Sequence, residues 1–279
     1  MKLISSIITY NPDLQRLKQN VAAIDPQVDE IVVVDNGSKN VADVIGSLSG
    51  YNNIHFIKNK DNMGIATALN EAAQYAKDQG YEWIITLDQD SVAPSNLVKT
   101  YLPYTNDKCI GMLCCKIIDR NFGELDINKR HNHGCEEVPM CITSASMMNI
   151  KAWDEVGGFP EDFFIDSVDF DICLSMRKHG YKIVRTNDTA LLHEVGHSEI
   201  RNFLGKQRQI YHHSPLRYYY MVRNGIYLGK RHHFTLRAIY RSIRLFILVE
   251  LFEENKWNKT KMMLKGFYHA AINRYGKYK

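Results

Sequence analysis

Short apolar runs alternate with helical stripes of apolar residues along the first 90 residues of the chain. Strands are predicted at residues 3–9, 30–34, 54–57 and 83–87, and the runs at 30–34 and 83–87 are apolar enough to be buried on both faces of a sheet. Helices are predicted between them. One begins at Pro12, with Asn11 as its cap, and another spans residues 64–77. This alternation predicts right-handed crossovers and an α/β fold with a Rossmann-like, mostly parallel sheet flanked by helices.

Polar clusters follow three of these predicted strands. The clusters are Thr9-Tyr10-Asn11, Asp35-Asn36 and Asp88-Gln89-Asp90. Parallel strands end at a common edge, which is where open α/β sheets bind ligands. Alternate residues of an extended chain point to the same side, so Asp88 and Asp90 can face one cation or one metal-bound diphosphate. The alternative for these carboxylates is an ordinary turn at a strand end, where Asp is favoured.

Two glycine-rich phosphate-binding motifs are missing from the chain. The first strand is followed neither by G-x-G-x-x-G nor by G-x-x-x-x-G-K-[ST]. A diphosphate at the sheet edge would therefore have to be neutralised by a cation.

Four motifs, taken in order, give the chain a resemblance to a known family. They are T-Y-N after the first strand, V-V-V-D-N-G-S after the second, N-x-G-I-A-x-A-x-N from residue 62, and L-D-Q-D-S after the fourth strand. Together they resemble the family 2 inverting glycosyltransferases, which have the GT-A fold. Residues 141–149 resemble the strand that follows the metal site in that family, and residues 157–164 resemble its G-G-F-x-E-x-F-F stretch.

The resemblance implies roles for the residues at the sheet edge. A nucleotide-sugar donor would be bound by Thr9, Tyr10, Asn11, Asp35, Asn36, Asn62, Gly64, Asp88 and Gln89. Mg²⁺ or Mn²⁺ would be bound by Asp90 and Asp88, together with His193, which falls where the family's metal-binding His follows a strand.

The resemblance also implies the catalytic base. The family's E-D-x-D pattern places the general base on Asp169, although Val168 stands where the family has an acidic residue, and Asp166 is the substitute. Direct displacement of a nucleoside diphosphate needs one base for the acceptor hydroxyl and one cation for the leaving charge. The alternative is that these carboxylates only favour the start of a helix through its dipole.

Residues 217–224 read R-x-Y-Y-x-x-R-N, which resembles a segment of bacterial rhamnosyltransferases within the family. The resemblance implies dTDP-L-rhamnose as donor, with another UDP- or dTDP-hexose as the alternative. It also implies a saccharide or lipid-linked saccharide acceptor in surface polysaccharide synthesis. Arg217 or Arg223 would meet diphosphate oxygens. An amphipathic helix whose tyrosines pack against the protein is the other interpretation.

The charge of the chain is unevenly distributed. Residues 201–279 contain 17 Lys and Arg but only three acidic residues, whereas residues 1–200 contain 18 basic and 28 acidic residues. Residues 237–252 predict an amphipathic helix with Arg237, Arg241 and Arg244 on one side, which is typical of binding to an anionic membrane surface. Packing on the core or in a homodimer interface is the competing explanation. Nucleic acid is disfavoured as a partner because the basic residues are interleaved with aliphatic runs.

These observations predict a catalytic GT-A domain at residues 1–205, with a nucleotide-sugar-binding half (1–115) and an acceptor half (116–205), followed by a basic amphipathic helical tail at 206–279. No signal peptide or bilayer-spanning stretch is recognisable in the sequence. We therefore expect a cytoplasmic protein that binds peripherally to the inner face of the cell membrane.

Two other functions are compatible with parts of the sequence. Residues 193–197 fit H-E-x-x-H, the zinc-peptidase motif, through His193 and His197. That motif needs a helix, whereas residues 189–192 predict a strand and Gly196 weakens a helix. A non-catalytic binder of nucleotide sugars or nucleic acid is the third hypothesis.

Overall fold

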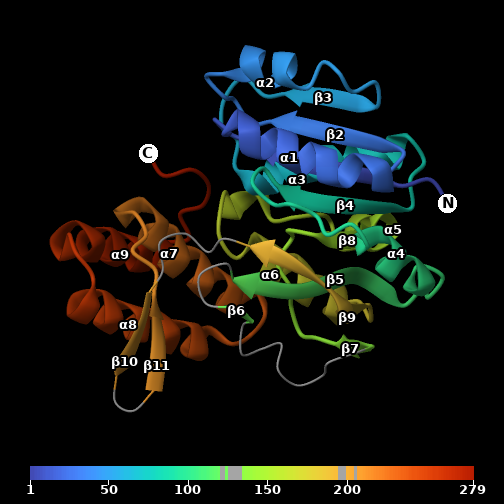
Figure 1. Cartoon of the computed structure of the whole chain (residues 1–279). Helices are drawn as coiled ribbons and strands as arrows, with labels where there is room; N and C mark the ends of the chain where they lie inside the picture. The colour runs from blue at the N-terminus through green and yellow to red at the C-terminus, as the bar shows by residue number, and fades with distance from the viewer. Residues whose placement is uncertain (120–122, 125–133, 194–198, 204–205) are drawn as a thin grey trace. The chain divides into compact units, whose positions relative to one another are not determined.

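The computed structural model describes residues 1–119, 123–124, 134–193, 199–203 and 206–279 (Figure 1). The chain forms two compact units, which are described separately. Unit 1 comprises residues 1–164 and 168–194. Unit 2 comprises residues 165–167 and 195–279.

Unit 1 is built on a mixed β-sheet with the strand order β3-β2-β1-β4-β8-β5-β9-β7, in which β6 pairs with β5. β3, β2, β1 and β4 are mutually parallel, and so are β5 and β9, whereas β8 runs antiparallel between β4 and β5. The bounds are β1 (Ile4–Thr9), β2 (Glu30–Asp35), β3 (Ile54–Lys58), β4 (Trp83–Asp88), β5 (Ile110–Asp119), β6 (Gly123–Glu124), β7 (Cys135–Glu137), β8 (Ser146–Asn149) and β9 (Lys182–His193). The predicted α/β fold and the four predicted strands are confirmed.

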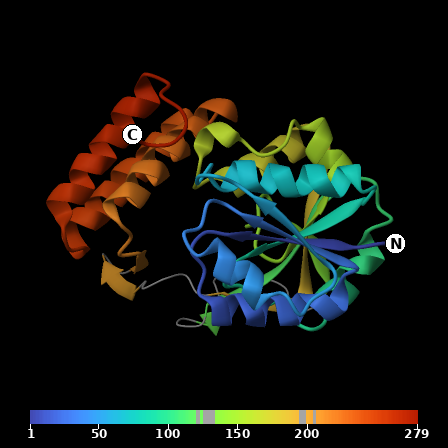
Figure 2. The same cartoon turned by 90° about the horizontal axis from the view of Figure 1, so that it is seen from above.

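Helices cover both faces of this sheet (Figure 2). All six residues of β1 are buried, including the polar residues Ser5, Ser6 and Thr9. α1 (Leu14–Ile24) lies on one face and packs Leu17, Val21 and Ile24 into the same core as the strands. α3 (Ile65–Asp78) lies on the other face and buries mainly alanines, whose short side chains let the helix approach the strands closely.

α1 begins later than the sequence predicted. Its cap is Asp13, whose Oδ1 accepts hydrogen bonds from the backbone N–H groups of Gln15 and Arg16, both at 2.9 Å. Asn11 has a φ of 47° and lies outside the helix, where its Oδ1 accepts from the Lys39 N–H at 2.9 Å. The prediction that Asn11 caps the helix was therefore wrong, because two candidate caps stand within three residues and Asp13 makes the capping bonds.

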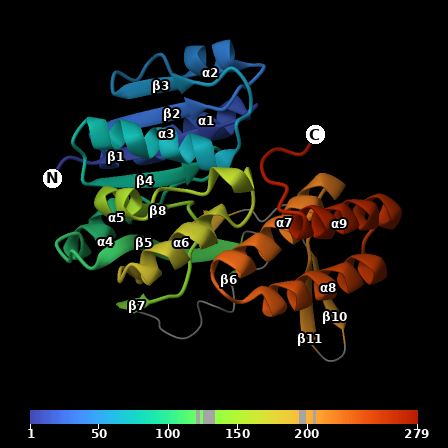
Figure 3. The ribbon, with the colours of Figure 1, turned by 180° about the vertical axis from the view of Figure 1, so that it is seen from behind.

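Further α-helices are described in unit 1. They are α2 (Val41–Ser47), α4 (Leu97–Tyr101), α5 (Ile150–Glu155) and α6 (Val168–Lys178). Seen from behind, α5 and α6 lie on the same side of the sheet as α3 (Figure 3). This arrangement brings the segment between α5 and α6 next to α3, which matters for the site described below.

The described residues of unit 2 form an antiparallel strand pair and three helices. The elements are β10 (Glu199–Phe203), β11 (Lys206–Ile210), α7 (Pro215–Arg231), α8 (Thr235–Phe252) and α9 (Lys256–Ala271). α7 begins with Pro215 behind the cap Ser214 and buries the three consecutive tyrosines Tyr218, Tyr219 and Tyr220. The helix predicted at residues 237–252 is present and begins two residues earlier. None of the helices in the described part of the chain has both the length and the apolar character that a bilayer crossing requires.

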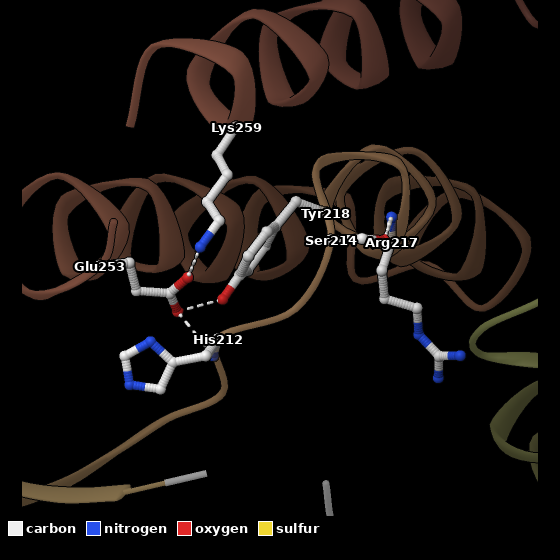
Figure 4. A network of polar contacts seen from close by, with 6 residues as sticks. All are labelled: His212, Ser214, Arg217, Tyr218, Glu253 and Lys259. Atoms are coloured by element: carbon white, nitrogen blue, oxygen red, sulfur yellow. Dashed lines mark hydrogen bonds and ion pairs between the residues drawn. The ribbon is translucent and has the colours of Figure 1, made fainter. Parts of the chain in front are cut away.

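A buried carboxylate ties the three helices of unit 2 together (Figure 4). Glu253 forms an ion pair with Lys259 at 2.6 Å, and it accepts hydrogen bonds from the Tyr218 hydroxyl and the His212 N–H. Burial and the neighbouring carboxylate raise the pKa of Tyr218 far above its ordinary value, so the phenol stays a proton donor. Because Glu253 and Lys259 are both buried, each neutralises a charge that would otherwise be unpaired inside the protein.

Candidate active site

The ends of β1, β2 and β4 form one polar edge. In the strand register Thr9 lies opposite Asp35, and Ile8 lies opposite Asp88. The Thr9 hydroxyl donates to Asp35 Oδ2 at 3.1 Å, and the Ser38 N–H donates to Asp35 Oδ1 at 2.8 Å. Asp35 is 1% exposed, so its carboxylate is held in one position. The sequence prediction that these strand ends meet is confirmed.

The segment after β4 is fastened to its neighbours by side-chain amides. Gln89 Oε1 accepts from the Tyr10 N–H at 2.8 Å, which connects the ends of β1 and β4. The buried Asn20 of α1 donates to the Asp88 carbonyl at 2.7 Å. Asp88 is partly exposed and Asp90 is exposed, so both can be reached by a ligand. Asn20 was not expected from the sequence, where it is one polar residue among several on a helix.

Asn36 and Asn62 shape the loop that leads into α3. Asn36 Oδ1 accepts from the Met63 N–H at 2.9 Å, and its Nδ2 donates to the Gly64 carbonyl at 3.1 Å. Asn62 Oδ1 accepts from the Gly64 N–H at 3.0 Å. Both amides thus support the loop geometry, and their predicted contacts with a nucleotide sugar stay predictions.

Gly64 allows a close approach between α3 and the segment that follows α5. Its φ of 93° is a left-handed conformation, and a Cβ at this position would lie 2.5 Å from the Phe164 carbonyl oxygen. The same carbonyl accepts from the Ile65 N–H at 2.8 Å. Any larger residue at 64 would push this segment away from the helix start.

Asn70 makes a second connection between α3 and the same segment. Its Oδ1 accepts from the Phe159 N–H at 2.8 Å and from the Trp153 ring N–H at 3.0 Å, and its Nδ2 donates to the Phe159 carbonyl at 3.0 Å. Asn70 is the last residue of the N-x-G-I-A-x-A-x-N motif, and Phe159 belongs to the G-G-F stretch. The two motifs therefore bind each other and fix the path of the chain toward α6.

Asp169 lies in the first turn of α6. Its side chain is partly exposed, and its Oδ1 accepts from the Phe170 N–H at 2.9 Å. Val168, which replaces an acidic residue of the family pattern, is 3% exposed and packs in the core. The departure from E-D-x-D thus turns one acidic position into a packing residue and leaves the neighbouring carboxylate at the helix start, where the dipole favours it.

Asp166 belongs to unit 2 and is held by α7. Arg217 Nε lies 2.8 Å from Asp166 Oδ2, and Asn224 Nδ2 donates to the carbonyls of Ile165 and Asp166 at 2.5 and 3.2 Å. Phe164, Asp166 and Ser167 all have φ values between 63° and 69°, an uncommon conformation for residues other than glycine. Burial raises the pKa of Asp166 to about 6, although the nearby Arg217 opposes this rise.

Arg223 has a different environment from the one that was predicted. The side chain is 0% exposed and donates to Asn224 Oδ1, the Tyr219 hydroxyl and the Gly276 carbonyl at 2.8, 3.2 and 2.6 Å. Its guanidinium also lies over the rings of Tyr219, Tyr220 and Tyr227. With no exposed surface, Arg223 does not support the predicted diphosphate contact. Its role here is to hold α7 to the C-terminal segment.

The residues predicted to hold a metal ion fit a hard divalent cation. Asp88 and Asp90 present carboxylate oxygens, the ligands that Mg²⁺ and Mn²⁺ prefer. Val92, two residues after Asp90, forms a β-bridge with Leu192, which places the backbone of His193 beside this segment. The His193 side chain lies outside the described residues. Among the described side chains no group of three or more His, Cys, Asp or Glu gathers as a metal site.

The zinc-peptidase interpretation fails at the first residue of its motif. His193 is the last residue of strand β9, whereas H-E-x-x-H places both histidines on one helix. His197 and the rest of the motif lie outside the described residues.

Comparison with known proteins decides the family. The sequence profile described as Glycosyl transferase family 2 matches residues 6–166, which is more than half of the chain. The chain belongs to this family. The matched span contains Thr9, Asp35, Asp88 and Asp90, and it ends at Asp166.

This family 2 glycosyltransferase also resembles individual proteins along nearly its whole length. It is 29% identical over 277 residues to the dTDP-rhamnosyl transferase RfbF of Shigella flexneri, covering 93% of this chain and 90% of that protein.

Solved structures show the same fold. S. aureus TarS 1-349 in complex with UDP-GlcNAc superposes with a TM-score of 0.63 and 15% identity, covering 97% of this chain and 81% of that one. The structure of GalNAc-T7 with UDP, GalNAc and Mn²⁺ superposes with a TM-score of 0.62 and 15% identity, covering 98% of this chain and 57% of that one. At this identity the likeness establishes the GT-A fold alone.

Proposed function

We propose that this glycosyltransferase moves one L-rhamnose from dTDP-L-rhamnose onto a saccharide or lipid-linked saccharide in surface polysaccharide synthesis, with inversion and with a divalent cation. The observation that carries the proposal is the meeting of Thr9, Asp35 and Asp88 at one sheet edge, in a chain related over 93% of its length to a dTDP-rhamnosyl transferase. Another UDP- or dTDP-hexose is the alternative donor.

The sheet edge would bind the nucleotide part of the donor. Asp35 is fixed by the Thr9 hydroxyl and the Ser38 N–H, so its carboxylate can accept a hydrogen bond from a base or sugar without first losing conformational freedom. Tyr10 is 46% exposed beside it and offers a ring surface to the base. Asn11, Asn36, Asn62, Gly64 and Gln89 complete the edge by holding these groups in place.

Asp90, Asp88 and His193 would hold Mg²⁺ or Mn²⁺ when it is bound. The cation would neutralise the charge that develops on the departing diphosphate. Arg217 is partly exposed and could add a second positive charge, although it already pairs with Asp166.

Asp169 would act as the general base. The acceptor oxygen attacks the anomeric carbon, the bond from that carbon to the diphosphate breaks, and Asp169 takes the hydroxyl proton. Two contacts support this proposal by holding the chain that leads to α6, because the Phe164 carbonyl is bound at the start of α3 and Phe159 is bound to Asn70. Asp166 is the substitute, since a pKa of about 6 would also suit a base near neutral pH.

We assign a separate proposed function to each of three consecutive parts of the chain. Residues 1–115 would bind the donor, residues 116–205 would bind the acceptor and carry the base, and residues 206–279 would form a basic appendage. A zinc-peptidase function is not favoured, because His193 ends a strand.

The donor and the base can be tested together. We would measure nucleoside diphosphate release from dTDP-L-rhamnose and from a panel of UDP- and dTDP-hexoses, with Mg²⁺ or Mn²⁺. The wild type is expected to use dTDP-L-rhamnose, and Asp169→Asn is expected to lose turnover by at least ~100-fold while it still binds dTDP. Asp43→Asn, an exposed change on α2, is the matched control. Turnover of UDP-hexoses alone would overturn the donor, and full activity of Asp169→Asn would move the base to Asp166.

A further inference from the structure

The outward face of α8 is unusually apolar. Leu236, Tyr240, Ile243, Ile247 and Leu251 are 85%, 65%, 48%, 47% and 49% exposed. Their spacing of three or four residues places them on one stripe of the helix, which we call the α8 stripe. Single exposed apolar residues are ordinary, but a continuous stripe of five indicates a surface that contacts something.

α8 packs onto its own unit through small residues on the opposite side. Ala238, Ser242 and Val249 are its buried residues, and Ala238 lies against Gly229 of α7, where an added Cβ would come within 2.7 Å. The helix therefore buries small side chains and leaves the five large side chains of the stripe exposed. This is the reverse of what a helix stabilised only by its own core requires.

The exposed charged residues of α8 itself are all positive. Arg237, Arg241 and Arg244 are exposed and, at 3.6 residues per turn, lie along one flank of the stripe. The single acidic residue of α8, Glu250, accepts a hydrogen bond from Thr260. Glu253, which follows the helix, is buried with Lys259.

We propose that α8 lies flat on an anionic lipid bilayer, with the stripe in the interfacial layer and the three arginines at lipid phosphates. Charge complementarity selects this occupant over a second copy docked through its own α8 stripe, because that copy would present the same row of arginines, and the only acidic residue of α8, Glu250, already accepts from Thr260. A helix of this pattern binds in the plane of the surface. The proposal holds whichever sugar the enzyme transfers.

The test is flotation of the full-length chain with vesicles of phosphatidylcholine alone, or with about a third of the lipid replaced by phosphatidylglycerol. The apparent affinity of the wild type for the anionic vesicles is expected to be at least ~10-fold higher than for the neutral vesicles. High salt is expected to release the protein from the anionic vesicles. Two variants are each expected to weaken binding to the anionic vesicles at least ~10-fold. One is the double variant Ile243→Gln/Ile247→Gln, and the other is the triple variant Arg237→Gln/Arg241→Gln/Arg244→Gln. The control is Leu102→Gln, at a residue 40% exposed in unit 1, which should bind like the wild type.

Three results would overturn the proposal. Absence of wild-type binding to the anionic vesicles is the first, and equal weakening by Leu102→Gln is the second. The third is a combination of two measurements: light scattering shows a dimer for the wild type and a monomer for the double isoleucine variant, and the variant binds vesicles as the wild type does. That combination would show that a second copy of the chain covers the stripe. None of these readouts uses turnover, so failure of the proposed donor would leave this test intact.

Discussion

The guanidinium of Arg217 lies 2.8 Å from the carboxylate of Asp166, three residues before the proposed base Asp169. The side chain of Asp166 is 14% exposed and that of Arg217 is 41% exposed, so the Asp166 carboxylate is the more strongly desolvated of the two. Burial accordingly raises the pKa of Asp166 to about 6 even though Arg217 acts to lower it. The pair belongs to unit 2, where α7 binds Asp166, which has a left-handed φ of 69°.

The raised pKa of Asp166 predicts a pH-dependent effect of Asp166→Asn on stability. A carboxyl whose pKa is higher in the folded than in the unfolded chain stabilises the fold when protonated, and it loses this contribution as pH rises from about 4 to about 6. Asn carries no charge at any pH, so the variant should gain about 3 kcal/mol of unfolding free energy relative to wild type over that range. Urea unfolding of both proteins at pH 4 and pH 7 measures this difference, and a difference that does not change with pH would contradict the assignment.

Replacing Asn224 by Ala should lower the stability of the protein without changing its charge. Its Nδ2 donates to the Ile165 and Asp166 carbonyls, and the residue is fully buried. Asn224→Ala should cost about 1–3 kcal/mol because both carbonyls lose a donor. It should also lower kcat if the path of this loop sets the position of Asp169. Asn258→Ala, at an exposed Asn of α9, is the control and should unfold like the wild type.

Gly64 predicts a steric effect that can be separated from backbone strain. Gly64 and Gly157 have similar φ values of 93° and 81°, but only at Gly64 would a Cβ meet another group, the Phe164 carbonyl at 2.5 Å. Both alanine variants bear the left-handed strain, roughly 1 kcal/mol. Gly64→Ala should be destabilised by at least ~1 kcal/mol more, with reduced transfer activity. Equal melting of the two variants would show that the contact between residue 64 and Phe164 has no energetic role.

Replacing Asp35 should reduce the affinity of the enzyme for its donor nucleotide. Asp35→Asn keeps the size of the side chain but removes the charge that strengthens a hydrogen bond to the nucleotide. Binding of dTDP, measured by calorimetry, should weaken ~10- to 100-fold. The exposed Asp43→Asn should bind dTDP like the wild type, and equal losses in the two variants would point to a general electrostatic effect.

The sheet edge could be predicted from sequence because it depends on short-range patterns. Apolar runs fix β1, β2, β3 and β4, and the rule that parallel strands end together brings Thr9, Asp35 and Asp88 to one place. No long-range information was needed for that step. The order of the motifs then identified the family that the comparison confirmed.

Other parts depend on contacts between residues far apart in the chain, and these could not be predicted. Asn70 binds Phe159, 89 residues away, and its place in the N-x-G-I-A-x-A-x-N motif does not tell which distant segment it contacts. Arg223 resembled a phosphate ligand, but three tyrosine rings enclose it. The antiparallel placement of β8 between β4 and β5 likewise follows from tertiary pairing, since a short apolar strand does not encode its direction.

The most direct test is calorimetric binding of dTDP to the wild type and to Asp90→Asn, each with and without Mn²⁺. Asp90 is exposed, so this substitution should leave the fold unchanged. We predict that Mn²⁺ strengthens dTDP binding to the wild type at least ~10-fold and has little effect on Asp90→Asn. Equal affinity of the wild type with and without the cation, or an undiminished Mn²⁺ effect in Asp90→Asn, would contradict a metal-bridged diphosphate at the end of β4.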